Sequence, residues 1–108
     1  MESVIHINGN NFDAAVRGTE LPVLVDFWAE WCSHCRELAP TLEKVAVELD
    51  GRLKIVKANV QEVPELATRY SVTNIPTMII FKDGQEVTRL VGNRTQAALI
   101  KELEPYLE

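Results

Sequence analysis

The segment Val23–Trp28 constrains the fold more than any other part of the sequence. Every residue in it except Asp26 is apolar or aromatic. A strand with one face in water alternates apolar and polar residues, whereas a strand covered on both faces is apolar almost throughout. The segment therefore predicts a central β-strand whose sheet is packed against helices on both faces.

The other elements alternate between helical and strand patterns. After the cysteines, apolar residues recur at three- and four-residue spacing, which predicts an amphipathic helix that ends near Asp50-Gly51. Further strands are expected at residues 4–7, 53–59, 77–82 and 86–91, and further helices at residues 11–17, at 64–70 and from an N-cap at Thr95. This βαβαβαββα order predicts an α/β fold with a mixed sheet and helices on both of its faces. The charged stretch 89–94 is interpreted as solvated surface around a turn.

Size and charge narrow the class of protein. The 108 residues are 46% apolar, which suits a single domain over residues 1–108 that buries roughly 65% of the surface of its unfolded chain. The 11 Lys and Arg against 16 Asp and Glu form no basic cluster, so nucleic acid is not an expected partner. No stretch approaches the ~20 apolar residues of a membrane span, and residues 1–11 lack the features of a secretory signal. We expect a cytoplasmic monomer with no membrane partner.

The only two cysteines, Cys32 and Cys35, lie three positions apart. A disulfide between them would close too short a loop to stabilise the fold much, because structural bridges act chiefly by closing long loops. Structural zinc would need His34, which is confined between the two thiols, and the distant His6. No metal and no cofactor beyond the cysteine pair is therefore expected. Reversible redox chemistry or two inert thiols remain.

The predicted elements give the two cysteines different environments. Cys32 falls where the strand passes into the helix, so its sulfur lies near unpaired amide donors and the positive end of the helix dipole, which favour a thiolate. Cys35 lies one turn later, in phase with the apolar stripe, and should be more buried. Cys32 is the expected nucleophile and Cys35 the expected resolving thiol.

Asp26 shares a strand face with Leu24 and Trp28. A carboxyl group there would be desolvated and its pKa raised, which suits a group that accepts a proton from Cys35. The alternative is a structural Asp whose oxygens accept hydrogen bonds.

A set of motifs spread along the whole chain is similar to the thioredoxin family. They are Val25-Asp26-Phe27-Trp28-Ala29, Trp31-Cys32-x-x-Cys35, Pro40, Lys57, Ile75-Pro76-Thr77, Gly84 and Gly92. The resemblance implies a thioredoxin fold with a five-stranded sheet and four helices, a cis peptide before Pro76, protein-disulfide clients, and a reductase that restores the dithiol.

The resemblance also implies roles for individual residues. It places Lys57 beside the Asp26 carboxyl, where it could bias its ionisation; a solvated strand lysine is the alternative. A cis bond before Pro76 would expose the Ile75 backbone to an extended substrate, although Pro76 could simply precede a strand. The matching apolar docking positions are Trp31, Val60, Ile75, Val91 and Gly92, of which Trp31 could instead belong to the core.

One departure concerns the direction of electron flow. Reducing thioredoxins usually have Gly-Pro between the cysteines, whereas this chain has Ser33-His34, and a His before the second Cys is typical of disulfide isomerases and oxidants. The His34 imidazole could stabilise the Cys32 thiolate or be an exposed spectator. A general protein-disulfide reductase is expected, with an oxidant or isomerase as the alternative. A redox-silent binding module is disfavoured because Cys32, Cys35, Asp26 and Pro76 are all present.

Overall fold

The computed structural model describes residues 4–107. Strand β2 (Val23–Trp28) lies at the centre of a five-stranded sheet and is buried except at its last residue. It pairs in parallel with β3 (Lys54–Asn59) and antiparallel with β4 (Thr77–Lys82). The edges are β1 (Val4–His6), parallel to β3, and β5 (Gln85–Val91), antiparallel to β4. The mixed sheet predicted from the sequence is confirmed.

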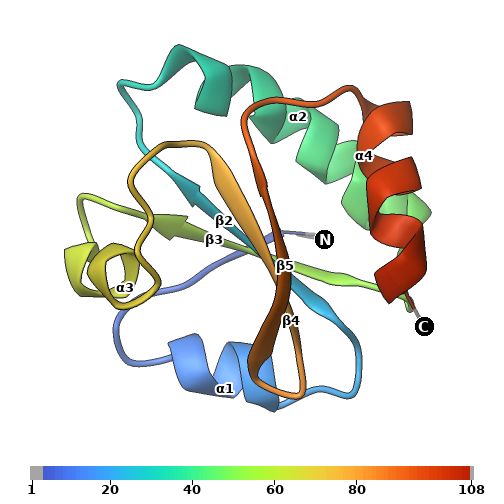
Figure 1. The fold of residues 1–108 in the computed structure, drawn as a ribbon, viewed down its shortest axis with the longest axis horizontal. Coiled ribbons are helices and arrows are strands. Elements are labelled where there is room, and N and C mark those ends of the chain that lie inside the picture. The colour runs from blue at the N-terminus through green and yellow to red at the C-terminus, as the bar shows by residue number, and fades with distance from the viewer. Residues whose placement is uncertain (1–3, 108) are drawn as a thin grey trace.

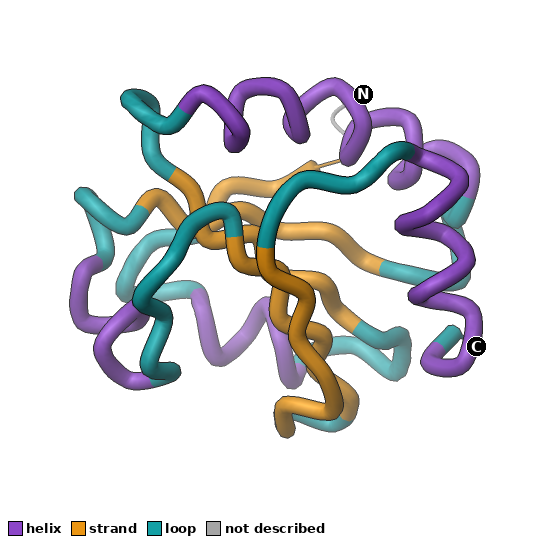
Figure 2. Tube along the Cα trace, turned by 45° about the horizontal axis from the view of Figure 1, so that its top comes forward, coloured by secondary structure: helices purple, strands orange, loops and turns teal. Residues whose placement is uncertain are grey.

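Helices cover both faces of this sheet (Figures 1 and 2). Helices α2 (Ser33–Glu48) and α4 (Gln96–Leu103) pack on one face, over a core that includes Leu24, Ile55 and Met78. Helices α1 (Phe12–Arg17) and α3 (Pro64–Arg69) pack on the other face. The neighbouring side chains of β2 alternate between these two cores, which explains why the segment is apolar almost throughout.

The element boundaries lie within one residue of the predicted ends, except that α2 ends at Glu48, two residues before Asp50; α2 runs through Pro40 without a break. The pattern did not predict the 3₁₀ helix Glu104–Tyr106 that follows α4. Pro105 explains it, because a proline has no amide hydrogen to continue an α-helix.

The strand register brings one end of four strands together. Phe27 near the end of β2 pairs with Thr77 at the start of β4, and Thr77 pairs with Val91 at the end of β5. On the other side of β2, Trp28 pairs with Asn59 at the end of β3. The segments that follow β2, β3 and β5 therefore meet the segment that precedes β4 at one end of the sheet, where the first three strands finish and β4 begins.

Thr95 caps α4, as predicted, because its side-chain oxygen accepts a hydrogen bond of 3.2 Å from the backbone N–H of Ala98. Thr95→Ala should lower the free energy of unfolding by about 1 kcal/mol. Thr95→Ser keeps the hydroxyl and should stay within a few tenths of a kcal/mol of the wild type. Urea unfolding at neutral pH measures both, and an alanine variant as stable as the wild type would show that the cap contributes nothing.

Candidate functional site

Cys32 occupies the N-cap position of the long helix α2, where the sequence analysis placed it. Its backbone is extended (φ −91°, ψ 109°), and its Sγ accepts a hydrogen bond of 3.2 Å from the backbone N–H of Cys35. The two residues form a disulfide with their Cα atoms 5.2 Å apart. After reduction, the same amide and the positive end of the helix dipole would stabilise a thiolate at Cys32.

The two sulfur-bearing residues differ in their accessibility. Cys32 keeps 8% of its surface exposed, whereas Cys35 keeps 1% and packs with the buried Ala29. A partner can therefore approach Cys32 but not Cys35. This asymmetry is the one expected for a nucleophile and a resolving thiol.

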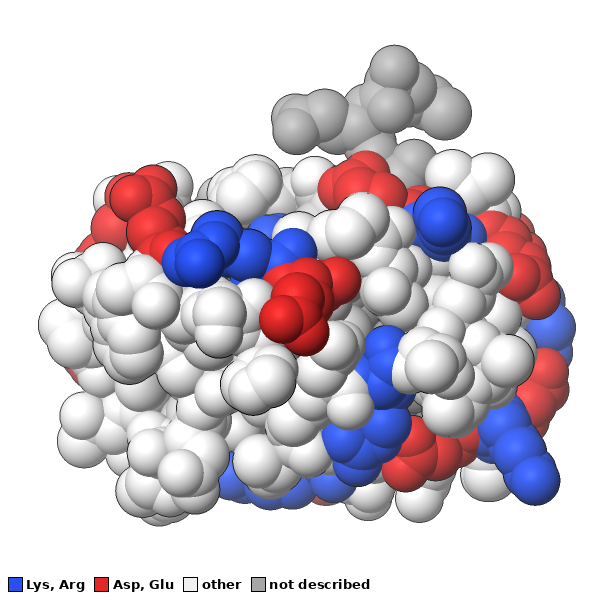
Figure 3. Space-filling view, turned by 90° about the horizontal axis from the view of Figure 1, so that it is seen from above, with Lys and Arg blue, Asp and Glu red and all other residues white. Residues whose placement is uncertain are grey.

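Exposed and half-buried apolar residues surround Cys32. Trp31 is 66% exposed and Val91 51% exposed, so Trp31 does not belong to the core. Val60 and Ile75 pack against the buried cluster of Ala29, Cys32 and Cys35. In the view from above, the lower left of the molecule is mostly uncharged, whereas acidic and basic side chains lie at the upper left, across the middle and on the right (Figure 3).

The segment before β4 contacts Cys32 directly. The Ile75–Pro76 peptide bond is cis, as the resemblance implied, and the carbonyl oxygen of Ile75 lies 3.8 Å from Cys32 Sγ. Gly92 donates its N–H to the carbonyl of Pro76 at 2.8 Å. The segments that carry the residues predicted to bind substrate thus converge at this end of the sheet. These residues are Trp31, Val60, Ile75, Pro76, Val91 and Gly92.

Asp26 is completely buried on the α2 side of β2, the face that also carries Leu24. Neither carboxylate oxygen has a hydrogen-bond partner among the described residues. Burial raises the pKa of Asp26 to about 7, although the positive charge of Lys57 lowers it in part. The carboxyl group can therefore exchange a proton near neutral pH.

Lys57 lies opposite Asp26 in the parallel register of β2 and β3. Its ammonium group lies 4.3 Å from the centre of the Trp28 ring, and the residue as a whole is half-buried. This contact is a cation–π interaction. Together with the register, this contact sets the position of the Lys57 side chain, whose positive charge lowers the pKa of Asp26 in part.

His34 lies on the surface, with 70% of its side chain exposed. Its Nδ1 is 3.5 Å from Oε1 of Glu37, and the same oxygen accepts a hydrogen bond of 3.4 Å from Asn93. The sequence analysis did not single out Glu37, although side chains three positions apart on a helix are neighbours. No group of three or more His, Cys, Asp or Glu within residues 4–107 could hold a metal ion.

The two arginines of the stretch 89–94 lie at the surface, as expected, but hydrogen bonds restrain both of them. Arg89 donates to the carbonyl of Tyr70 at 2.8 Å and pairs with Glu86 at 2.7 Å. Arg94 pairs with Glu102, also at 2.7 Å, with a quarter of its side chain exposed. Long side chains can fold back on local carbonyls, which a charge pattern does not indicate.

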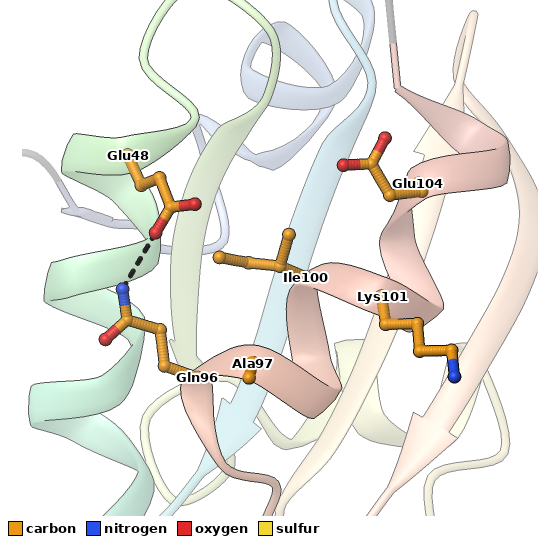
Figure 4. Close-up of a pocket in the computed structure, with 6 residues that line it drawn as sticks. All are labelled: Glu48, Gln96, Ala97, Ile100, Lys101 and Glu104. Carbon is orange, nitrogen blue, oxygen red and sulfur yellow. Dashed lines mark hydrogen bonds between the residues drawn. The ribbon is translucent and has the colours of Figure 1, made fainter.

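A separate hollow lies between α2 and α4 (Figure 4). It is lined by Glu48, Gln96, Ala97, Ile100, Lys101 and Glu104, none of which is a predicted site residue. Gln96 donates to Glu48 across it at 2.9 Å. Among the described residues, no helix is both long enough and apolar enough to cross a membrane.

The sequence matches the family model described as thioredoxin over residues 3–105. Thioredoxin 1 of Nostoc sp. is 39% identical over 107 residues, covering 99% of this chain and 100% of that protein. The thioredoxin of Mycobacterium bovis is 45% identical over 94% of this chain and 87% of its own length. A bifunctional thioredoxin reductase/thioredoxin of Mycobacterium leprae is 44% identical over 92% of this chain and 22% of that protein. With a helix-capping Cys32, a buried Cys35 and these relatives over nearly its whole length, the chain belongs to the thioredoxin family.

Proposed function

We propose that this thiol–disulfide oxidoreductase reduces protein disulfides through attack by Cys32 and resolution by Cys35. These roles are inferred from the difference in burial between the two cysteines: Cys32, at the N-cap of α2, is partly accessible, whereas Cys35, one turn later, is buried. Membership of the thioredoxin family favours reduction of protein disulfides over the other readings.

The reaction takes place in two exchanges. The Cys32 thiolate attacks one sulfur of the client disulfide, which forms a mixed disulfide and releases the other client sulfur as a thiolate. Cys35 then loses its proton and attacks Cys32 Sγ, which forms the Cys32–Cys35 disulfide and releases the second client thiolate. The client gains two electrons, the cysteine pair loses two, and the released thiolates take up protons.

Asp26 is the proposed acceptor of the Cys35 proton, with Lys57 as the modulator of its charge. The carboxyl group is buried on the face of β2 that packs against α2, the helix that carries Cys35. A pKa of about 7 lets it be deprotonated before resolution and protonated after it at neutral pH.

The residues that surround Cys32 form the proposed client surface. Trp31 and Val91 supply exposed apolar area, and the Ile75 backbone beside Cys32 Sγ is placed to pair with an extended client segment. A thioredoxin reductase is the proposed electron donor, supported by the relative in which the two activities share one chain. The cytoplasmic location, the monomeric state and the single domain over residues 1–108 stay predictions.

An oxidant or isomerase role is the second candidate, and it is supported by His34 alone. An imidazole that stabilises the Cys32 thiolate stabilises the reduced form and so makes the protein more oxidising. In this structure the imidazole nitrogen Nδ1 faces Glu37, on the exposed side of the first turn of α2.

The assignment of the two cysteines predicts unequal trapping of clients. Cys35→Ser should accumulate long-lived mixed disulfides through Cys32, because the resolving thiol is absent, whereas Cys32→Ser should accumulate almost none. Non-reducing electrophoresis after mixing with a disulfide-containing protein such as insulin measures both. Equal trapping by the two variants would contradict the assignment.

The burial of Asp26 predicts a pH-dependent gain of stability on its removal. The native protein keeps the Asp26 proton up to about pH 7 and the unfolded chain releases it near 3.8, so stability falls as pH rises through this window. Asp26→Asn should therefore be more stable than the wild type by up to about 4 kcal/mol at pH 8, and the gain should largely vanish near pH 4.

Urea unfolding at the two pH values measures this effect, with the exposed Asp50→Asn as a matched control that should show little gain. Client reduction by Asp26→Asn should also be slower, because resolution loses its proton acceptor. A variant that is clearly less stable than the wild type at pH 8 would mean that the carboxylate is a satisfied structural group.

The role proposed for His34 predicts two linked shifts. Replacing His34 by Pro should raise the pKa of Cys32 and make the redox couple more reducing by on the order of 30 mV, with insulin reduction retained. His34→Gln is the control, because proline also restricts the backbone at the start of α2. Thiolate absorbance against pH gives the Cys32 pKa, and equilibration with glutathione gives the potential. An unchanged Cys32 pKa in His34→Gln would rule out the electrostatic role.

A further inference from the structure

The guanidinium group of Arg94 folds back over the loop between β5 and α4. Its Nη1 donates to the carbonyl of Val91 at 2.8 Å and to the carbonyl of Gly92 at 3.2 Å. Its Nε donates to Oε2 of Glu102 on α4 at 2.7 Å, and three quarters of the Arg94 side chain is buried. One side chain thus ties two successive peptide groups to a neighbouring helix.

These two peptide groups belong to the proposed client surface. Gly92 has a φ of +95°, a region that glycine enters freely, so its backbone has little intrinsic preference for the observed conformation. The planar guanidinium supplies the missing restraint, because its donors have a fixed geometry and converge on both carbonyls. A Cβ built on Gly92 would lie 3.6 Å from Arg94 Nη1, so the guanidinium lies close to the glycine.

The restrained loop is connected to the reaction centre. The N–H of Gly92 donates to the carbonyl of Pro76, and the preceding carbonyl, that of Ile75, lies 3.8 Å from Cys32 Sγ. The carbonyl at 2.8 Å from Arg94 Nη1 belongs to Val91, whose side chain is half exposed. A loop that is ordered before binding loses less conformational entropy when a client docks.

We propose that Arg94, held by Glu102, is a positioning residue for client recognition, which fixes the Val91-Gly92 segment in the conformation that protein disulfides bind. This inference rests on the proposed client surface. Arg94 takes no part in thiol exchange itself, so its loss should weaken the binding of large clients and leave the chemistry of the cysteines unchanged.

The test compares Arg94→Ala and Glu102→Gln with the wild type in single-turnover reduction of insulin by the pre-reduced protein. For both variants the half-saturating insulin concentration should rise about three- to tenfold, with the limiting rate unchanged. The rate with oxidised glutathione, which is too small to span the surface, and the redox potential should also stay at wild-type values. Arg52→Ala is the matched control, because it removes an arginine of another surface ion pair, with Glu104.

The two variants separate positioning from electrostatic steering. Arg94→Ala makes the protein more negative and Glu102→Gln makes it less negative, so steering by net charge would move the half-saturating concentration in opposite directions. Positioning moves it upward in both. Arg94→Lys keeps the charge but lacks the planar donor set, and a half-saturating concentration above that of the wild type supports the proposal.

Three results would overturn the proposal: wild-type half-saturation in Arg94→Ala, opposite shifts in the two variants, or wild-type behaviour of Arg94→Lys. A glutathione rate or potential that changes in step with insulin reduction would also overturn it, because the variant would then have altered the cysteines. Failure of the wild-type protein to reduce insulin would instead contradict the proposed function, so the two failures are distinguishable.

Discussion

The antiparallel pairing of β2 with β4 determines where the reaction centre lies. β2 delivers Cys32 at its carboxyl end, and antiparallel pairing places the start of β4 beside that end, which brings Ile75 and Pro76 next to the sulfur. β5 runs antiparallel to β4 and brings Val91 to the same end of the sheet. If β4 were parallel to β2, Pro76 would lie at the opposite end of the sheet, and only α2 and the segment that follows β3 would remain beside Cys32.

The groups around Cys32 come from two kinds of structure: a long helix, which holds the sulfur, and loops, which supply the apolar residues around it. The sulfur is held by the N-terminus of α2, a helix of 16 residues packed against the main core, so the amide that faces it moves little. The apolar residues around it come from loops, which adopt many conformations unless side chains restrain them. The polar contacts of Arg94, Asn93 and Glu37 supply such restraints on the side facing α2 and α4.

Features that depend on neighbours in the sequence could be predicted, whereas features that depend on contacts between distant segments could not. The strand, the helix start at Cys32 and the buried phase of Cys35 depend on local periodicity, and the observed boundaries agree within about a residue. Asp26 was predictable because its neighbours on the strand are apolar. The Lys57–Trp28 contact and the fold-back of Arg94 depend on the sheet register and on the shape of a loop, neither of which a periodic pattern contains. The resemblance supplied the residues of the proposed client surface, but it gave no information on what holds them in place.

The instability introduced by Asp26 and the proton-acceptor role proposed for it have the same origin. Raising the pKa of Asp26 from 3.8 to about 7 costs the fold roughly 4 kcal/mol when the group is ionised. A thiol with an ordinary pKa of about 8.5 would transfer its proton to an ordinary carboxylate uphill by roughly 6 kcal/mol, and to a carboxylate with a pKa near 7 by only about 2 kcal/mol. The free energy that burial takes from stability is therefore the free energy by which it would ease the proposed proton transfer from Cys35. A hydrogen-bond donor to either Asp26 oxygen would stabilise the folded protein and would make the carboxylate a weaker base for this step.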